Sequence, residues 1–118
     1  MFNFEKLDVW HKAIDFAELV YSVTLAFPRD ERFGLTNQMR RAAVSISSNL
    51  AEGTSRSSKT DFARFVEIAT GSVFEVVSQA TISKRQKFLP EDDFQRIYAA
   101  AEEKSRMLSG LRRSLVGE

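Results

Sequence analysis

The sequence contains no cysteine and only one histidine. Without cysteine the chain can form no disulfide framework, no thiolate nucleophile and no cysteine-based zinc site. A single histidine cannot build a metal site unless carboxylates or other subunits supply further ligands. No serine, cysteine or carboxylate arrangement marks His11 as catalytic. We therefore expect no metal, no cofactor, no small-molecule substrate and no enzymatic activity.

Proline and glycine are also scarce, with 2 and 5 residues in a chain of 118. So few helix-breaking residues favour a few long helices over many short strands. No apolar run approaches the roughly 20 residues that a membrane-spanning helix needs, and residues 1–6 lack the apolar core of a signal peptide. We expect a cytoplasmic protein without a membrane partner. Residues 1–118 are predicted to form a single domain.

Charge of either sign is nearly balanced, with 17 basic and 16 acidic residues and a net charge of +1. Dedicated nucleic-acid-binding domains are usually strongly basic, so a polyanionic partner would have to be met by local clustering. One such cluster lies within residues 36–59, where four cations face Glu52 alone, a local balance of 4 − 1 = +3. These four candidate nucleic-acid contacts are Arg40, Arg41, Arg56 and Lys59.

Apolar residues recur at helical spacing in four segments. The first helix is expected over residues 8–26, with Asp8 as its N-cap. The second is expected over about residues 35–52, and Gly53 is predicted to stop it. The connection between them is short enough for an antiparallel pair of helices.

The third helix is expected over about residues 58–87, with Ser58 and Asp61 in a capping box. Gly71 lies in its middle, where close helix packing or a slight kink would account for it. The fourth helix is expected from Pro90 to about Val116. Three acidic residues follow Pro90; they suit the positive end of a helix, and consecutive acids cannot all converge on one metal ion. The predicted fold is an all-α, up-down-up-down antiparallel four-helix bundle.

The first and third helices carry more apolar surface than one bundle core requires. A helix that buries one face needs an apolar stripe of only ~100° or somewhat more. The surplus predicts a homo-oligomer. Our candidates for its interface are Trp10, Phe16, Phe74 and Ile82.

The second helix carries a polar face formed by Arg41, Ser45, Ser48 and Glu52, with Arg40 to one side. Serine is a mediocre helix former, so these residues were not selected for helix propensity. Two interpretations remain open: a contact surface for RNA or another subunit, or an ordinary solvated face.

Two further groups of cations lie towards the C-terminus. Lys84, Arg85 and Lys87 are expected in the last turn of the third helix, where positive charge favours the helix dipole; a phosphate-binding cluster is the alternative. The C-terminal segment is also basic, through Lys104 and three arginines.

Several motifs resemble a bacterial family of four-helix-bundle proteins encoded in intervening sequences of 23S ribosomal RNA genes and sometimes labelled S23 ribosomal proteins. The most specific of these motifs are residues 38–46 (Gln-Met-Arg-Arg-Ala-Ala-Val-Ser-Ile) and 48–53 (Ser-Asn-Leu-Ala-Glu-Gly). The resemblance implies a four-helix bundle that assembles as a homopentamer. It also implies a relation to the accessory protein of diversity-generating retroelements, a basic pentameric barrel that binds reverse transcriptase and nucleic acid.

Two functional hypotheses follow. The first is an oligomeric scaffold that binds RNA, or a nucleic-acid-processing protein, through the four cations of residues 36–59. The second is a protein-interaction scaffold with no nucleic-acid role. In the second hypothesis the same cations form salt bridges between subunits, with Glu52, Asp61 or Glu67 as their partners.

Overall fold

The computed structural model describes residues 1–117, which form four α-helices and two short 3₁₀-helices and contain no strand. The predicted four-helix, all-α fold is confirmed. The bundle measures 43 × 24 × 20 Å. The elements in chain order are η1 (Asn3–Lys6), α1 (Asp8–Thr24), η2 (Arg29–Glu31), α2 (Leu35–Thr54), α3 (Lys59–Arg85) and α4 (Glu91–Val116).

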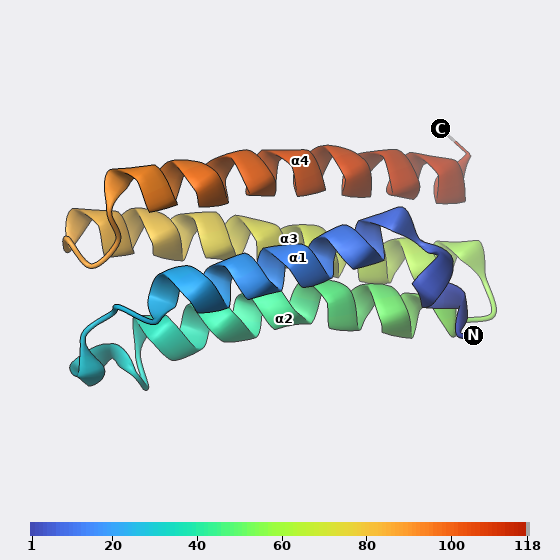
Figure 1. Ribbon diagram of the computed structural model, residues 1–118. Helices are drawn as coiled ribbons and strands as arrows, with labels where there is room; N and C mark the ends of the chain where they lie inside the picture. The colour runs from blue at the N-terminus through green and yellow to red at the C-terminus, as the bar shows by residue number, and fades with distance from the viewer. Residues whose placement is uncertain (118) are drawn as a thin grey trace.

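The helices run alternately up and down, and each packs on two neighbours. α1 contacts α2 and α4, and α3 contacts α2 and α4. The α1–α2 and α3–α4 connections lie at one end of the bundle, and the α2–α3 corner lies at the other end with both termini (Figure 1). None of the helices formed by residues 1–117 combines the length and hydropathy needed to cross a membrane.

All four helices contribute apolar side chains to one continuous core. Burial of apolar area is the main favourable term in folding, at about 25 cal/mol per Å². The largest fully buried apolar side chains are Phe16, Met39, Ile46, Leu50, Ile97 and Leu108.

The first helix differs from the prediction at both ends. Asp8 is not the N-cap: that position is Leu7, and Asp8 is the first helical residue, where its charge still suits the helix dipole. The helix ends at Thr24, two residues earlier than predicted. Phe27 then turns back into the core and is only 8% exposed. Pro28 is the N-cap of η2, and the connection between α1 and α2 is longer than the sequence indicated because α1 ends earlier.

Gly53 does not stop α2, which continues to Thr54. It is buried against α3, and an added Cβ atom would lie 2.8 Å from the Phe62 ring and 2.9 Å from the Cβ of Phe65. Gly53 therefore allows the two helices to approach closely. The last turn of α2 is closed instead by Thr54 and Ser55, whose hydroxyls donate to backbone carbonyls.

Ser58 is the N-cap of α3, and its hydroxyl accepts a hydrogen bond from the backbone N–H of Asp61 at 3.1 Å, which is one half of the predicted capping box. The close helix packing that would account for Gly71 is not found within residues 1–117. Gly71 is exposed, and apart from its two chain neighbours and the nearby backbone of α3, nothing in residues 1–117 lies within 4 Å of a Cβ added there. Close packing at this level belongs to its neighbour Ser72, which is buried and accepts a hydrogen bond from Ser45 of α2.

The end of α3 is set by Lys87, a feature that the sequence did not indicate. Lys87 has a left-handed backbone with φ of 65°. Its N–H donates to the carbonyl of Lys84, and that of Phe88 donates to the carbonyl of Ser83, both at 2.9 Å. This pattern closes the helix as a Schellman motif, a place normally taken by glycine.

Candidate nucleic-acid interface

The four predicted nucleic-acid contacts form two pairs. Arg40 and Arg41 lie in the second turn of α2, whereas Arg56 and Lys59 lie at the corner between α2 and α3. The two pairs are separated by roughly 20 Å along the helix at 1.5 Å per residue. The local charge of +3 that the sequence indicated is therefore spread along α2.

Arg40 is held in place by α1. Its guanidinium lies over the Tyr21 ring, with 4.6 Å between Cζ and the ring centroid. Nε donates to the hydroxyl of Thr24 at 2.9 Å, and Nη2 donates to the backbone carbonyl of Tyr21 at 3.4 Å. The Thr24 hydroxyl in turn donates to the carbonyl of Val20 at 2.8 Å. Because α1 ends at Thr24, the positive charge also complements the negative end of that helix dipole.

Arg41 lies one residue further along α2 and is exposed. None of the ion pairs formed by residues 1–117 involves Arg41 or Arg40. Arg40 and Arg41 lie ~100° apart around the helix, so both cannot be fully buried in one core. The sequence therefore predicts that at least one guanidinium reaches the surface or a subunit boundary, and Arg41 is exposed in the chain.

Both arginines line a shallow groove between α1 and α2, which we call the arginine face. Its lining combines cations, one aromatic ring and small polar groups, a composition suited to a phosphodiester chain. The residues of the arginine face are Tyr21, Asn37, Arg40, Arg41, Val44, Ser45 and Ser48.

The serines of this helix face have different roles. Ser45 is half-buried and donates to Ser72, so it serves the contact between α2 and α3. Ser48 is exposed and lines the arginine face. The polar face predicted from the sequence is therefore part helix packing and part open surface.

The second pair of cations is less available to phosphate. Arg56 forms an ion pair with Glu52 at 2.9 Å and lies over the ring of Phe65, 4.6 Å from its centroid. An exposed ion pair of this kind contributes about 0–1 kcal/mol to stability, but it does neutralise the charge locally. Lys59 is exposed and begins α3.

The proposed inter-subunit acids are also partly engaged. Glu52 binds Arg56, and Glu67 accepts from Nε of Arg112 at 2.8 Å. Asp61 takes part in none of the ion pairs formed within the described chain.

The candidate interface residues divide into surface and core. Phe74 and Ile82 are 61% and 48% exposed, and Trp10 is half-buried. Phe16 is 1% exposed and belongs to the core of its own chain, so it has almost no surface for an interface with another chain.

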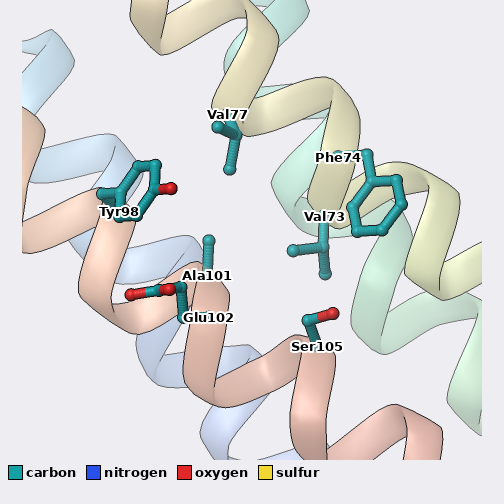
Figure 2. A pocket seen from close by; sticks show the side chains of 7 residues that line it. All are labelled: Val73, Phe74, Val77, Tyr98, Ala101, Glu102 and Ser105. Carbon is teal, nitrogen blue, oxygen red and sulfur yellow. The ribbon is translucent and has the colours of Figure 1, made fainter.

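Phe74 borders an apolar groove of about 250 Å³ between α3 and α4. Figure 2 shows Phe74 and Val77 of α3 on one side of this groove and Tyr98 and Ala101 of α4 on the other. Tyr98 is also partly exposed, at 43%. The groove presents apolar surface that the monomer leaves uncovered.

Two features could not be foreseen from the helical pattern. At the N-terminus, Phe2 stacks on Phe4 with ring centroids 5.5 Å apart, and Phe4 lies 5.0 Å from Trp10. The rings of Trp10 and His11 are nearly perpendicular with centroids 5.0 Å apart, and Nε2 of His11 lies 2.7 Å from the backbone carbonyl oxygen of Glu5. These contacts give His11 a structural place in the chain. All residues of this cluster lie within residues 2–11, and the high aromatic content of that segment was the only indication of the cluster in the sequence.

Lys104 is the second such feature, because it is buried rather than part of a basic surface. It is 4% exposed, and its Nζ donates to Glu103 at 2.8 Å and to the carbonyl of Ala100 at 3.3 Å. The hydrogen bond from Lys104 lowers the pKa of Glu103. Its Nζ also lies 5.8 Å from the ring centroid of Phe16 on α1. Lys104 therefore lies in the contact between α4 and α1, with its hydrogen-bond partners on α4 and an aromatic ring of α1 nearby.

The acidic residues that begin α4 lie at the positive N-terminal end of the helix dipole, as predicted. Glu91 forms an ion pair with Lys84 at 2.7 Å, and this hydrogen bond, with one from Gln95, lowers the pKa of Glu91. Asp93 pairs with Arg96 at 3.3 Å. Among residues 1–117 no cluster of histidine and acidic residues could hold a metal ion.

Comparison with known proteins gives the family. The sequence matches the profile of the 23S rRNA-intervening sequence protein family over residues 5–110. No match was found among curated proteins. The fold is similar to the crystal structure of a protein of unknown function from the S23 ribosomal protein family of Bacteroides thetaiotaomicron. The TM-score is 0.79 at 20% identity, over 89% of this chain and 98% of that one. The chain therefore belongs to the 23S rRNA-intervening sequence protein family.

Proposed function

We propose that this protein is a non-enzymatic, oligomeric scaffold in the cytoplasm that binds RNA through the arginine face. The observation that carries the proposal is the state of Arg41, which is exposed and has no carboxylate partner within residues 1–117. Arg40 beside it is fixed over Tyr21. A guanidinium is well suited to phosphate, because its planar fork can donate paired hydrogen bonds.

A single chain offers too little charge for tight binding, since its net charge is only +1. Assembly removes this difficulty, because each subunit adds another Arg40 and Arg41. Phosphate affinity rises steeply with the number of phosphates neutralised. We propose a homo-oligomer, a pentamer on the resemblance, in which Trp10, Phe74 and Ile82 lie at or near the interface.

A second candidate function is a protein-interaction scaffold without RNA. The observation that favours it is the apolar groove between α3 and α4, bordered by the exposed ring of Phe74 (Figure 2). In that case Arg41 would pair with a carboxylate of a neighbouring subunit, and Asp61 is the candidate that its own chain leaves without an ion pair.

The two functions are separated by measuring the affinity for a structured RNA at two salt concentrations, with oligomer mass followed by light scattering. Arg41→Ala removes one cation that forms no ion pair within the described chain, so the fold should be unaffected. We expect weaker binding at low salt, and a salt slope that is smaller by about one for each phosphate that Arg41 neutralises in the wild type. Arg106→Ala on α4 also removes one exposed cation and is the matched control, which should change neither quantity.

Two results would contradict the RNA proposal. One is the absence of binding at low salt by an intact oligomer. The other is a lower oligomer mass in Arg41→Ala with RNA affinity unchanged, which would place Arg41 at the boundary between subunits.

A further inference from the structure

A polar groove lies between α2 and α3, next to the arginine face. Its volume is about 550 Å³, within the range of small-ligand sites. Asn37 and Arg41 line it from α2, Glu75 and Gln79 line it from α3, and Phe33 lines it from the loop before α2. Asn37 and Arg41 also line the arginine face, so the groove continues that surface.

The α3 side of the groove presents hydrogen-bond acceptors. Glu75 and Gln79 are four residues apart and so share one face of the helix. Glu75 is exposed, and its carboxylate takes part in none of the ion pairs formed by the described residues. The Oε1 atom of Gln79 is buried and has no hydrogen-bond partner in residues 1–117. A buried polar atom without a partner is costly. Because the Gln79 side chain lines the groove, a turn about its side-chain bonds would bring this oxygen to a donor of a bound ligand, and the hydrogen bond would remove the cost.

Phe33 adds an aromatic surface. Its side chain is 84% exposed, and the guanidinium of Arg32 lies 5.4 Å from its ring centroid. Exposed aromatic rings beside cations are the usual platform for unpaired bases in single-stranded RNA.

We propose that this groove binds one unpaired guanine base of the RNA, with the base near Phe33 and its phosphate at Arg41. This inference rests on the proposed RNA-binding function. Guanine is the base whose Watson–Crick edge presents two adjacent donors, the N1–H and the N2 amino group. Glu75 and Gln79 supply the matching acceptors. Adenine and cytosine present one amino donor beside an acceptor nitrogen, and that nitrogen would face a carboxylate.

The proposal is tested with labelled uridine heptamers that carry one central guanosine, inosine, adenosine or cytidine. Binding to the intact protein is measured by fluorescence anisotropy at about 50 mM salt. We expect the guanosine oligomer to bind roughly tenfold more tightly than the adenosine and cytidine oligomers. Inosine lacks only the N2 amino group, so its affinity should fall between them.

Two variants locate the site. Glu75→Gln changes one exposed side chain, and Gln79→Leu removes the unpartnered oxygen without adding a polar group. Each should bring the ratio of guanosine to adenosine affinity towards one while leaving the salt slope unchanged. Glu102→Gln on α4 is the matched control and should keep the preference. Circular dichroism verifies that each variant is folded.

Each outcome decides the question. Binding of all four oligomers with equal affinity would overturn the guanine site and leave the proposed function standing. A guanine preference that survives both Glu75→Gln and Gln79→Leu would also overturn the site. No binding of any oligomer by a protein that does bind the structured RNA would overturn the guanine site alone. No binding of any oligomer at low salt, together with no binding of the structured RNA, would overturn both proposals.

Discussion

Two glycines of the bundle should respond to alanine in opposite directions, because only one of them lies between helices. In Gly53→Ala the new methyl carbon would lie 2.8 Å from the Phe62 ring and 2.9 Å from the Cβ of Phe65. Favourable carbon contacts lie at about 3.5–4.0 Å. The Phe62 ring can rotate away, but the Cβ of Phe65 is fixed to its backbone, so α2 and α3 must move apart.

The expected magnitude follows from two opposing effects. Overpacking costs roughly 1–3 kcal/mol. Alanine is favoured over glycine by at most ~1 kcal/mol in a helix interior, and by less in a last turn such as that of Gly53. Gly53→Ala should therefore lower the free energy of unfolding by about 1–2 kcal/mol. Gly71→Ala should raise it by up to about 1 kcal/mol, since the added carbon would meet no other helix and no side chain of residues 1–117 beyond its two chain neighbours.

Urea unfolding followed by circular dichroism measures both variants, with an unchanged m-value as the check that the comparison is valid. A Gly53→Ala protein as stable as the wild type would refute the close approach of α2 and α3. A Gly71→Ala protein that is destabilised, with a midpoint that depends on protein concentration, would mean that a neighbouring subunit covers this face of α3.

Three further predictions concern charged side chains. Lys87→Gly should raise the free energy of unfolding by about 1 kcal/mol in urea titrations, because glycine adopts the left-handed conformation of residue 87 without the steric cost of a Cβ atom. A decrease in stability would contradict the assignment of a Schellman motif. The hydrogen bond from Lys84 lowers the pKa of Glu91 below 4.5. The ionised Glu91 therefore contributes to stability above pH ~4.5, and this contribution is lost as the pH falls through the pKa of Glu91 in the folded protein. Unfolding measured between about pH 6 and 3 should therefore show a flatter pH dependence in Glu91→Gln. Lys104→Met keeps the buried volume and removes the charge, so the free energy of unfolding of this variant should stay within about 1 kcal/mol of the wild type or rise. Lys104→Ala leaves a cavity and should lower the free energy of unfolding by roughly 2 kcal/mol or more. Urea titrations measure both variants.

The four helices could be predicted because each carries a long apolar stripe, and periodicity reports such stripes directly. Their ends were less predictable. Gly53 resembled a stop signal, but the chain uses its missing side chain for helix packing. Lys87 adopts a left-handed conformation, which sequence-based prediction expects only of glycine. Conformational preference is a weak guide where tertiary contacts compete with it.

The candidate site was predicted only in part. Periodicity indicated that Arg41 or Arg40 must reach the surface or a subunit boundary, and Arg41 is exposed in the chain. α1 is apolar around most of its circumference, so the periodicity of its sequence could not distinguish buried Phe16 from partly exposed Trp10. The burial of Lys104 depends on where α1 packs against α4, which the sequence of one helix does not contain.

The groove between α2 and α3 could not be predicted from the sequence for a related reason. Arg41 lies on α2, whereas Glu75 and Gln79 lie on α3, far away in sequence. Only the antiparallel pairing of the two helices brings them together. The unpartnered oxygen of Gln79 is likewise a property of packing, since glutamine in a helix is ordinarily solvated.

The most direct test of the central claim is ultraviolet crosslinking of the intact oligomer to RNA, with the crosslinked residues identified by mass spectrometry. Aromatic rings stacked on bases are the expected sites of reaction. Our account predicts crosslinks at Tyr21 and Phe33, which flank Arg40 and Arg41, and their disappearance in Arg41→Ala at moderate salt. Crosslinks confined to the N-terminal aromatic residues or to α4, with none at Tyr21 or Phe33, would contradict it.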